Sequence, residues 1–271
     1  MIADLRHHLS VGAMYGRLSM QRALEYPFSL LSICLGLGFN YIWIGVALKV
    51  LVDRFQPLSG WTFSQLAFLY GLSLMSRGAM SILSFQSRQI DRFVTRGEFD
   101  LMLLRPLEIT FHFSCHRINV VGLVHLGIGA GYFLYGARLS GFVWTPLNVA
   151  EVLLVIAGGT LIYWSYLTLI SSIAFWTMRS QPLVDASMEL MARGTFYPLT
   201  VYPWPLQALL TFVLPLGFIG FYPACDFLGQ SANTSLPLDV ALWTPVVGVA
   251  MLVLALAVFA AGLRRYESAG S

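Results

Sequence analysis

One group of side chains in this sequence has the spacing of a metal site. Glu108, His112 and His116 recur at i, i+4 and i+8, which places them on one face of a helix with Cys115 beside them. The group begins at the expected edge of an apolar span, however, where water partly hydrates a Glu–His pair. We therefore interpret the histidines as interfacial or hydrogen-bonded groups and predict no metal site. A membrane-embedded enzyme acting on a lipid-like substrate is the alternative.

Ionisable residues within apolar spans are the second group of candidates, because a charge at membrane depth is costly and often functional. Arg77 and Arg117 each lie about two turns from the end of a span. They could line a transport pathway, or their long side chains could extend to the interface. Asp185, Glu189 and Arg193 follow at i, i+4 and i+8. This spacing predicts one ion pair and a polar stripe facing a partner helix or an aqueous pathway, unless the segment lies flat on the membrane surface.

A charged stretch between two apolar spans, residues 88–106, has the pattern of a short helix. Ile90, Phe93 and Val94 fall at i, i+3 and i+4 and so form one apolar face. Gly97 is placed to end that helix, and Asp100 is placed to begin a second helical turn. Pro106 then stops this turn, since proline disfavours helix in the residue before it.

Two short helical pieces joined at a glycine are typical of an element that docks on a partner protein. The apolar face would be buried in a cleft of the partner, and the charges would fix the register. A solvated loop is the alternative. The residues that we assign to partner binding are Ile90, Arg92, Phe93, Val94, Arg96, Gly97, Glu98, Asp100, Arg105 and Pro106.

Several well-known motifs are missing from the sequence. There is no GxxxxGK[ST] phosphate loop, and Lys49 is the single lysine, so the chain is not itself a P-loop ATPase. HExxH and GxSxG are absent as well. Basic clusters of the kind that bind nucleic acid are also absent. We expect a protein that is not an enzyme and holds no cofactor.

The composition is that of an integral membrane protein. Hydrophobic residues make up 57% of the chain and charged residues 11%, with a mean hydropathy of +0.72. We predict an all-α fold of six spans in a single transmembrane domain, residues 1–271, with an interfacial segment at 1–27 and a cytoplasmic loop at 86–107. The expected spans are 28–51, 61–85, 109–135, 149–177, either 180–200 or 206–222, and 241–263.

The distribution of arginines predicts the orientation of these spans. The N-terminal segment, the loop at 86–107 and the pair Arg264 and Arg265 all fall on one side if six spans are counted. The positive-inside rule places this side in the cytoplasm. We therefore expect a multi-pass protein of the plasma (inner) membrane with both termini in the cytoplasm.

Two stretches of the chain resemble one known family. VTRGEFDLMLLRPL (residues 94–107) is similar to the cytoplasmic loop of ABC-2 type transporter permeases, and YPLTVYPWPLQALLTFVLPLGFIGFYPA (residues 197–224) is similar to a later segment of the same permeases. The distance between the two also fits, so the resemblance covers nearly the whole chain. It implies a membrane subunit of an exporter that is driven by ATP.

The resemblance further implies the partners of the chain. Such permeases work as pairs, here with an identical or related second permease, and with two separate ATPase subunits that bind ATP and magnesium. Residues 88–106 would be the coupling helix seated in the ATPase. A segment such as 196–228 would fold as a re-entrant hairpin, whereas hydropathy favours 206–222 as a span. Membrane lipid is a further partner, and the export substrate is not specified. A non-transporting membrane scaffold is a third hypothesis.

Overall fold

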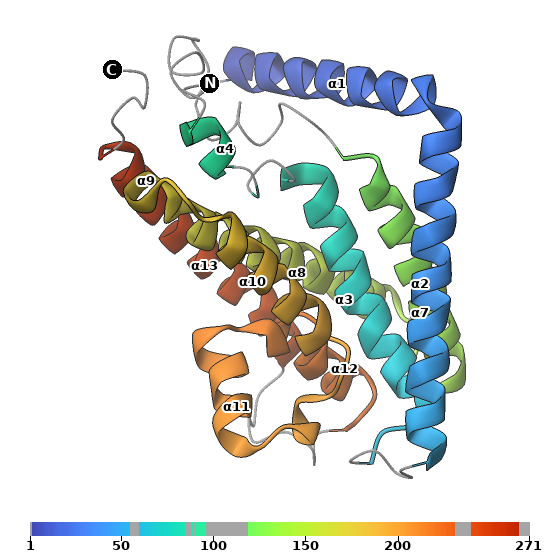
Figure 1. Ribbon diagram of the computed structural model, residues 1–271. Helices are drawn as coiled ribbons and strands as arrows, with labels where there is room; N and C mark the ends of the chain where they lie inside the picture. Colours follow the sequence, from blue (N-terminus) through green and yellow to red (C-terminus); the bar gives the residue numbers. More distant parts are fainter. Residues whose placement is uncertain are drawn as a thin grey trace.

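Helices account for the regular structure throughout the part of the chain that the structure describes. The structure is a computed structural model, and it describes residues 2–54, 60–84, 88, 90–95, 119–230 and 240–265. Long helices pack side by side as a bundle, and shorter ones lie at its two ends (Figure 1). The prediction of an all-α membrane fold is therefore confirmed.

The first two helices form an elbow at one end of the bundle. Helix α1 (Ile2–Glu25) runs across this end, and α2 (Pro27–Arg54) runs down the side (Figure 1). Proline is favoured at the first position of a helix, where its missing N–H is not needed, and Pro27 occupies that position in α2. Large apolar side chains along α2 are exposed, among them Phe28 and Phe39. An apolar surface of this kind suits contact with lipid or with another membrane helix.

Closely packed glycines join α3 (Phe63–Ser84) to α7 (Val121–Leu139). The glycines recur every seven residues, as Gly71 and Gly78 in α3 and as Gly122, Gly129 and Gly136 in α7. A Cβ atom added at Gly136 would lie 2.4 Å from the backbone nitrogen of Phe68. The two helix backbones are therefore in contact, as small residues permit between membrane helices.

The same kind of packing joins α8 (Pro146–Ser172) to α13 (Val240–Leu263). A Cβ atom at Gly158 would lie 2.6 Å from the backbone nitrogen of Pro245, and one at Gly248 would lie 2.6 Å from the Gly158 oxygen. Helix α8 is also tied to α3, because the Thr160 hydroxyl donates to the Ser76 carbonyl oxygen at 3.2 Å. Helices α3, α7, α8 and α13 thus form the closely packed centre of the fold.

Beyond α8, the chain turns back along the bundle. The short helix α9 (Ala174–Thr177) follows α8, and Met178 makes the turn with a left-handed backbone, φ 56°. Helix α10 (Gln181–Gly194) then runs back beside α8 (Figure 1). Its far end is held there by a hydrogen bond of 3.2 Å between the hydroxyl groups of Tyr163 and Thr195.

A bent segment follows α10, and its two halves meet at 78°. The second half packs on residues at the end of the bundle opposite α1. The ring of Phe221 lies 5.8 Å from that of Trp61, and the Thr244 hydroxyl donates to the Phe218 carbonyl oxygen at 2.9 Å. The elements of the segment are η2 (Leu199–Val201), α11 (Trp204–Ala208), the π-helix η3 (Leu209–Val213), η4 (Leu216–Phe218) and α12 (Phe221–Phe227).

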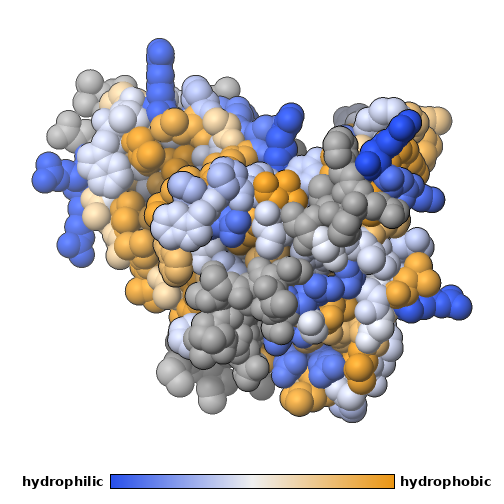
Figure 2. Space-filling model, turned by 90° about the horizontal axis from the view of Figure 1, so that it is seen from below, coloured by the Kyte–Doolittle hydropathy of each residue, from blue (hydrophilic) through white to orange (hydrophobic). Residues whose placement is uncertain are grey.

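This placement bears on the fifth span. The bent segment is entered from the far end of α10 and packs near the start of α13 (Figure 1), and its bend fits either a broken span or a re-entrant hairpin. Seen from this end, hydrophilic residues project at the rim and hydrophobic ones lie between them (Figure 2). A mixed surface of this kind suits a face at the boundary of a membrane.

Among the described residues, four helices are long and apolar enough to cross a membrane, or five if the bent segment is one span. These four are Pro27–Arg54, Phe63–Leu83, Pro146–Thr177 and Trp243–Leu263, and they match four of the predicted spans. Helix α7 covers the later part of the predicted span 109–135, whose first residues lie outside the description. The total of six spans therefore stays a prediction.

Candidate functional site

The apolar face that the sequence predicts for the charged stretch is present, and other helices of the same chain cover it. Helix α4 (Ile90–Thr95) buries Ile90, Phe93 and Val94, which are 0%, 6% and 1% exposed. The periodicity of the sequence thus predicted the face correctly. These side chains form a cluster with residues of α9 and α13, namely Ala174, Phe175, Phe259 and Leu263.

This burial corrects one expectation from the sequence. We expected Ile90, Phe93 and Val94 to enter a cleft of a partner protein, but in this structure the chain's own helices occupy that face. Periodicity shows that a face will be buried and does not show what will cover it. Arg92 and Thr95 are the exposed residues of α4. A partner that binds α4 in this conformation would therefore meet Arg92, Thr95 or both.

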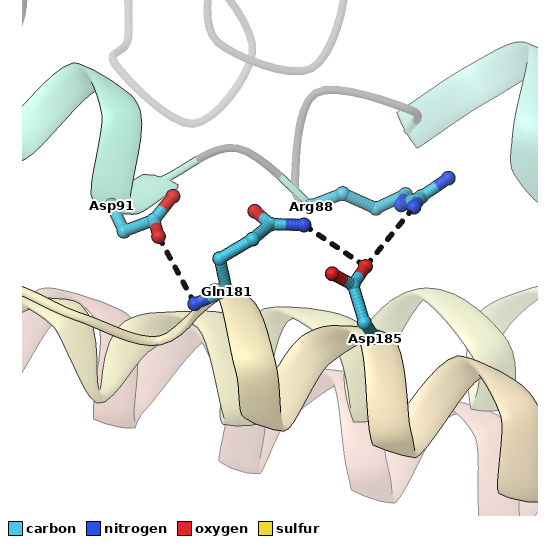
Figure 3. Close-up of polar contacts among 4 residues, drawn as sticks. All are labelled: Arg88, Asp91, Gln181 and Asp185. Atoms are coloured by element: carbon cyan, nitrogen blue, oxygen red, sulfur yellow. Dashed lines mark hydrogen bonds and ion pairs between the residues drawn. The ribbon is translucent and has the colours of Figure 1, made fainter.

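Polar contacts hold α4 on the first turn of α10 (Figure 3). The backbone N–H of Gln181 donates to Asp91 Oδ2 at 3.0 Å. The first N–H groups of a helix have no partner within it, and a carboxylate is favoured there by the helix dipole. Ser180, which precedes the helix, makes no capping bond through its side chain. Asp91 thus serves as the cap of α10, although it belongs to another helix.

A second polar contact lies one turn further along α10. Asp185 Oδ1 accepts from Gln181 Nε2 at 3.0 Å and pairs with Arg88 Nη2 at 3.5 Å (Figure 3). The side chain of Asp185 is 57% exposed and that of Arg88 is 28% exposed. Because water screens an exposed pair, this contact adds at most about 1 kcal/mol to stability. Its main effect is to align α4 with α10.

The remaining acidic and basic residues of α10 pair with each other. Arg193 Nε lies 2.5 Å from Glu189 Oε1, which confirms the predicted i, i+4 ion pair. Both side chains are exposed, and both line a cavity of about 460 Å³ between α2, α3, α7 and α10. Asp185 does not line this cavity, since it is turned toward α4. The expected polar stripe of α10 is therefore divided. Asp185 contacts Arg88, whereas Glu189 and Arg193 line the cavity.

Arg77 lies at the centre of the cavity region. It is partly buried, and it lines both the larger cavity and an adjoining one of about 330 Å³. His125 of α7 lines both cavities as well, and sequence reasoning missed it. Its Nδ1 lies 3.0 Å from the Val121 oxygen of its own helix. The signal that could have found it was a histidine within an apolar helix.

Part of the predicted site lies outside the described residues. This holds for seven of the assigned residues, Arg96, Gly97, Glu98, Asp100, Arg105, Pro106 and Arg117. It holds also for Glu108, His112 and His116, so our interpretation of this group stays a prediction. Within the described ranges, no group of three His, Cys, Asp or Glu side chains is placed to hold a metal ion.

Comparison with known proteins decides the family. The family described as ABC-2 family transporter protein has a model that matches residues 39–270. This match covers most of the chain. The chain belongs to the ABC-2 transporter family. The resemblance found in the sequence is thereby confirmed, and no curated protein and no solved structure matches the chain.

Membership of the ABC-2 family defines the general role of the protein. The chain is a permease subunit of an ABC transporter, a membrane protein whose partner is an ABC ATPase. The ABC-2 permease therefore contributes the membrane part of the transporter. The site described above lies at the end of the bundle that α1, α4 and the last turn of α13 share (Figure 1).

Proposed function

We propose that this ABC-2 permease is the membrane subunit of an exporter and that α4 receives the movement of its ATPase. The observation that carries the proposal is the division of α4 into two faces. Ile90, Phe93 and Val94 anchor it to the bundle, while Arg92 and Thr95 are exposed. A helix held on one side and free on the other suits transmission from a partner to the membrane domain.

Helix α10 is the proposed next step in this transmission. Its first turns are held by Asp91 of α4 and by Arg88, which precedes α4 in the sequence. Its later turns contribute Glu189 and Arg193 to the cavity that also contains Arg77. Because a helix is stiff over a few turns, a displacement of α4 would move the cavity wall. The ATPase would thus act on the cavity without touching it.

The finer features of the transporter are also proposals. The arginines at the α4 end of the bundle, among them Arg264 and Arg265, favour a cytoplasmic position for this end and for both termini. The protein would then lie in the plasma (inner) membrane. We expect two ATPase subunits, which bind ATP and magnesium, and a second permease, identical or related. We expect no cofactor in this chain.

Reversal of the exposed charge on α4 tests the proposal. Arg92→Glu should leave the bundle folded, because the side chain is exposed, and should weaken association with the ATPase. The loss of a charged partner at an interface costs about 2–5 kcal/mol. Arg138→Glu makes the same charge reversal in the last turn of α7, and it is the matched control. The measurement is co-purification of the ATPase and its hydrolysis of ATP. Normal association in Arg92→Glu would mean that α4 is not the coupling element.

A further inference from the structure

Arg77 differs from the other charged residues around the cavity because, within the described part of the chain, no acidic side chain pairs with it. Glu189 pairs with Arg193, and Asp185 pairs with Arg88. No hydrogen bond or ion pair joins the Arg77 guanidinium to any residue within the described ranges. Arg77 lies seven residues before the end of α3, which is about 10 Å along the helix axis. An unbalanced cation at such depth is costly and therefore calls for a function.

The cavities around Arg77 are large enough for a ligand. Their volumes are about 460 and 330 Å³, and both are lined by Leu37, Arg77 and His125. Ligand sites of drug-sized molecules begin at about 300 Å³. One cavity extends to Arg88 and Asn119 near α4, and the other extends to Tyr197 beyond α10. Arg77 thus lies where the two spaces meet.

One wall of the larger cavity is apolar and aromatic. Helix α2 contributes Leu37, Tyr41 and Ile44, and Phe196 follows α10. Tyr41 is fixed in place, since the hydroxyl of Tyr132 donates to its carbonyl oxygen at 2.6 Å. A ligand here would find the Arg77 cation, the ion pair of Glu189 with Arg193, and a surface suited to a hydrocarbon or an aromatic body. These are the requirements of an amphiphile with a negative head.

We infer that this cavity binds an amphiphilic anion whose phosphate or carboxylate head pairs with Arg77 and whose apolar body lies against α2. The inference rests on the proposed function, since it names the substrate class of the exporter. Arginine is suited to this role because its planar guanidinium can donate two parallel hydrogen bonds to one phosphate or carboxylate. The ion pair of Glu189 and Arg193 lies at the wall of the same cavity and can separate to admit the head.

Binding to the purified full chain tests the inference without the ATPase. The chain is placed in phosphatidylcholine nanodiscs, and binding of radiolabelled dodecyl phosphate is measured above that of empty discs. Dodecyltrimethylammonium has the same chain and the opposite charge, and should not compete. Arg77→Gln should weaken binding about ten- to a hundredfold, the range expected when one charge-assisted hydrogen bond is lost. Arg77→Lys should retain part of the affinity.

Two controls separate the site from general effects. Arg138→Gln also removes one arginine, but at an exposed position outside both cavities, and should bind dodecyl phosphate as the unchanged chain does. Arg92→Glu should bind it normally even where it loses the ATPase, so a failure of the coupling proposal and a failure of the anion site are distinguishable. Gel filtration confirms that each variant is folded.

A competition experiment decides whether the anion is a membrane lipid or a single-chain amphiphile. If phosphatidylglycerol in the nanodiscs that hold the chain displaces dodecyl phosphate, a membrane lipid can supply the negative head. If phosphatidylglycerol does not displace it, the site takes an anion with a single hydrocarbon chain. The proposal is wrong if Arg77→Gln binds dodecyl phosphate as tightly as the unchanged chain, or if dodecyltrimethylammonium competes equally. In either case Arg77 would simply extend to the interface.

Discussion

The contact between α3 and α7 and the contact between α4 and α10 hold the protein together in opposite ways. In the first, glycines bring two backbones together, so that an atom added at Gly129 or Gly136 has no space. In the second, Asp91 and Arg88 reach across to the first turn of α10 through side chains. Backbone contacts permit little sliding, whereas side-chain contacts can re-form after a shift. The comparison separates a rigid centre from a movable end.

The movable part in this account consists of α4, α9 and α10. Ile90, Phe93 and Val94 pack against α9 and the end of α13, and α10 follows α9 after a single turn at Met178. The cavity with Arg77 lies between this part and the rigid centre. A shift of α10 relative to α3 would therefore change the shape of the cavity.

The largest effect is expected at the α3–α7 contact. Gly129→Val would place a Cβ 2.8 Å from the backbone nitrogen of Met75, which side-chain movement cannot relieve. Overpacking of this kind costs about 1–3 kcal/mol or more, and here it acts on the centre of the fold. Gly131→Val on the same helix is the control, since nothing lies within 4 Å of its Cβ. We expect a lower thermal midpoint and a lower yield of folded protein for Gly129→Val. Equal stability of the two variants would contradict the rigid contact.

A large but local effect is expected at the α4 anchor. Phe93→Ala removes a buried ring from the cluster with Phe175 and Phe259, and a buried Phe→Ala change typically costs about 3–5 kcal/mol. Because the cavity weakens the anchor of α4 and leaves the glycine contacts of the centre intact, the loss should appear as faster hydrogen exchange in residues 90–95, with α3 and α7 unchanged. Arg92→Ala, at an exposed position of α4, is the control. Faster exchange throughout the bundle would show that α4 is part of the rigid centre.

A smaller effect is expected at the cap of α10. Asp91→Asn keeps a side-chain oxygen for the N–H of Gln181 and removes the negative charge next to the helix dipole. Such a charge contributes about 0.3–1 kcal/mol. We expect faster hydrogen exchange in the first turn of α10 and no change in its last turn beside Tyr163. Asp53→Asn, at an exposed position near the end of α2, is the control. Exchange that is unchanged in Asp91→Asn would show that the cap contributes nothing.

Local patterns in the sequence predicted local features of the fold and of the site. The i, i+3, i+4 pattern of Ile90, Phe93 and Val94 predicted a helix with one buried face, and the i, i+4 spacing of Glu189 and Arg193 predicted their ion pair. Both depend on neighbours within one helix turn, so the sequence contains the information directly. The contacts of the glycines in α3 and α7 come from the structure, which shows which helix each glycine meets.

Contacts between distant segments could not be predicted in this way. Arg88 and Asp185 are separated by 97 residues, and nothing in their local sequence indicates that they meet. For the same reason the apolar face of α4 was assigned to a partner when α9 and α13 cover it. The bent segment after α10 was uncertain because hydropathy measures how apolar a segment is and not whether it turns back. Packing decided the first two cases, and the fifth span stays a prediction.

The central claim is that α4 and α10 move together against α3, and two crosslinks test it directly. The variants replace the native Cys34, Cys115 and Cys225. One pair, Arg88→Cys with Asp185→Cys, joins α10 to the position two residues before α4, and so ties α4 to α10 within the movable part. The other, Ser81→Cys with Met188→Cys, joins α3 to α10 across the smaller cavity. A short bifunctional thiol reagent closes each pair in the reconstituted complex, and hydrolysis of ATP by the ATPase is measured.

We predict that the crosslink between α4 and α10 leaves coupled hydrolysis of ATP nearly unchanged. The crosslink between α3 and α10 should arrest hydrolysis of ATP. When the linker of the reagent can be cleaved by reduction, reduction should restore hydrolysis. Variants with one cysteine of each pair, treated in the same way, control for modification alone. Arrest by the α4–α10 crosslink together with normal hydrolysis after the α3–α10 crosslink would contradict the account.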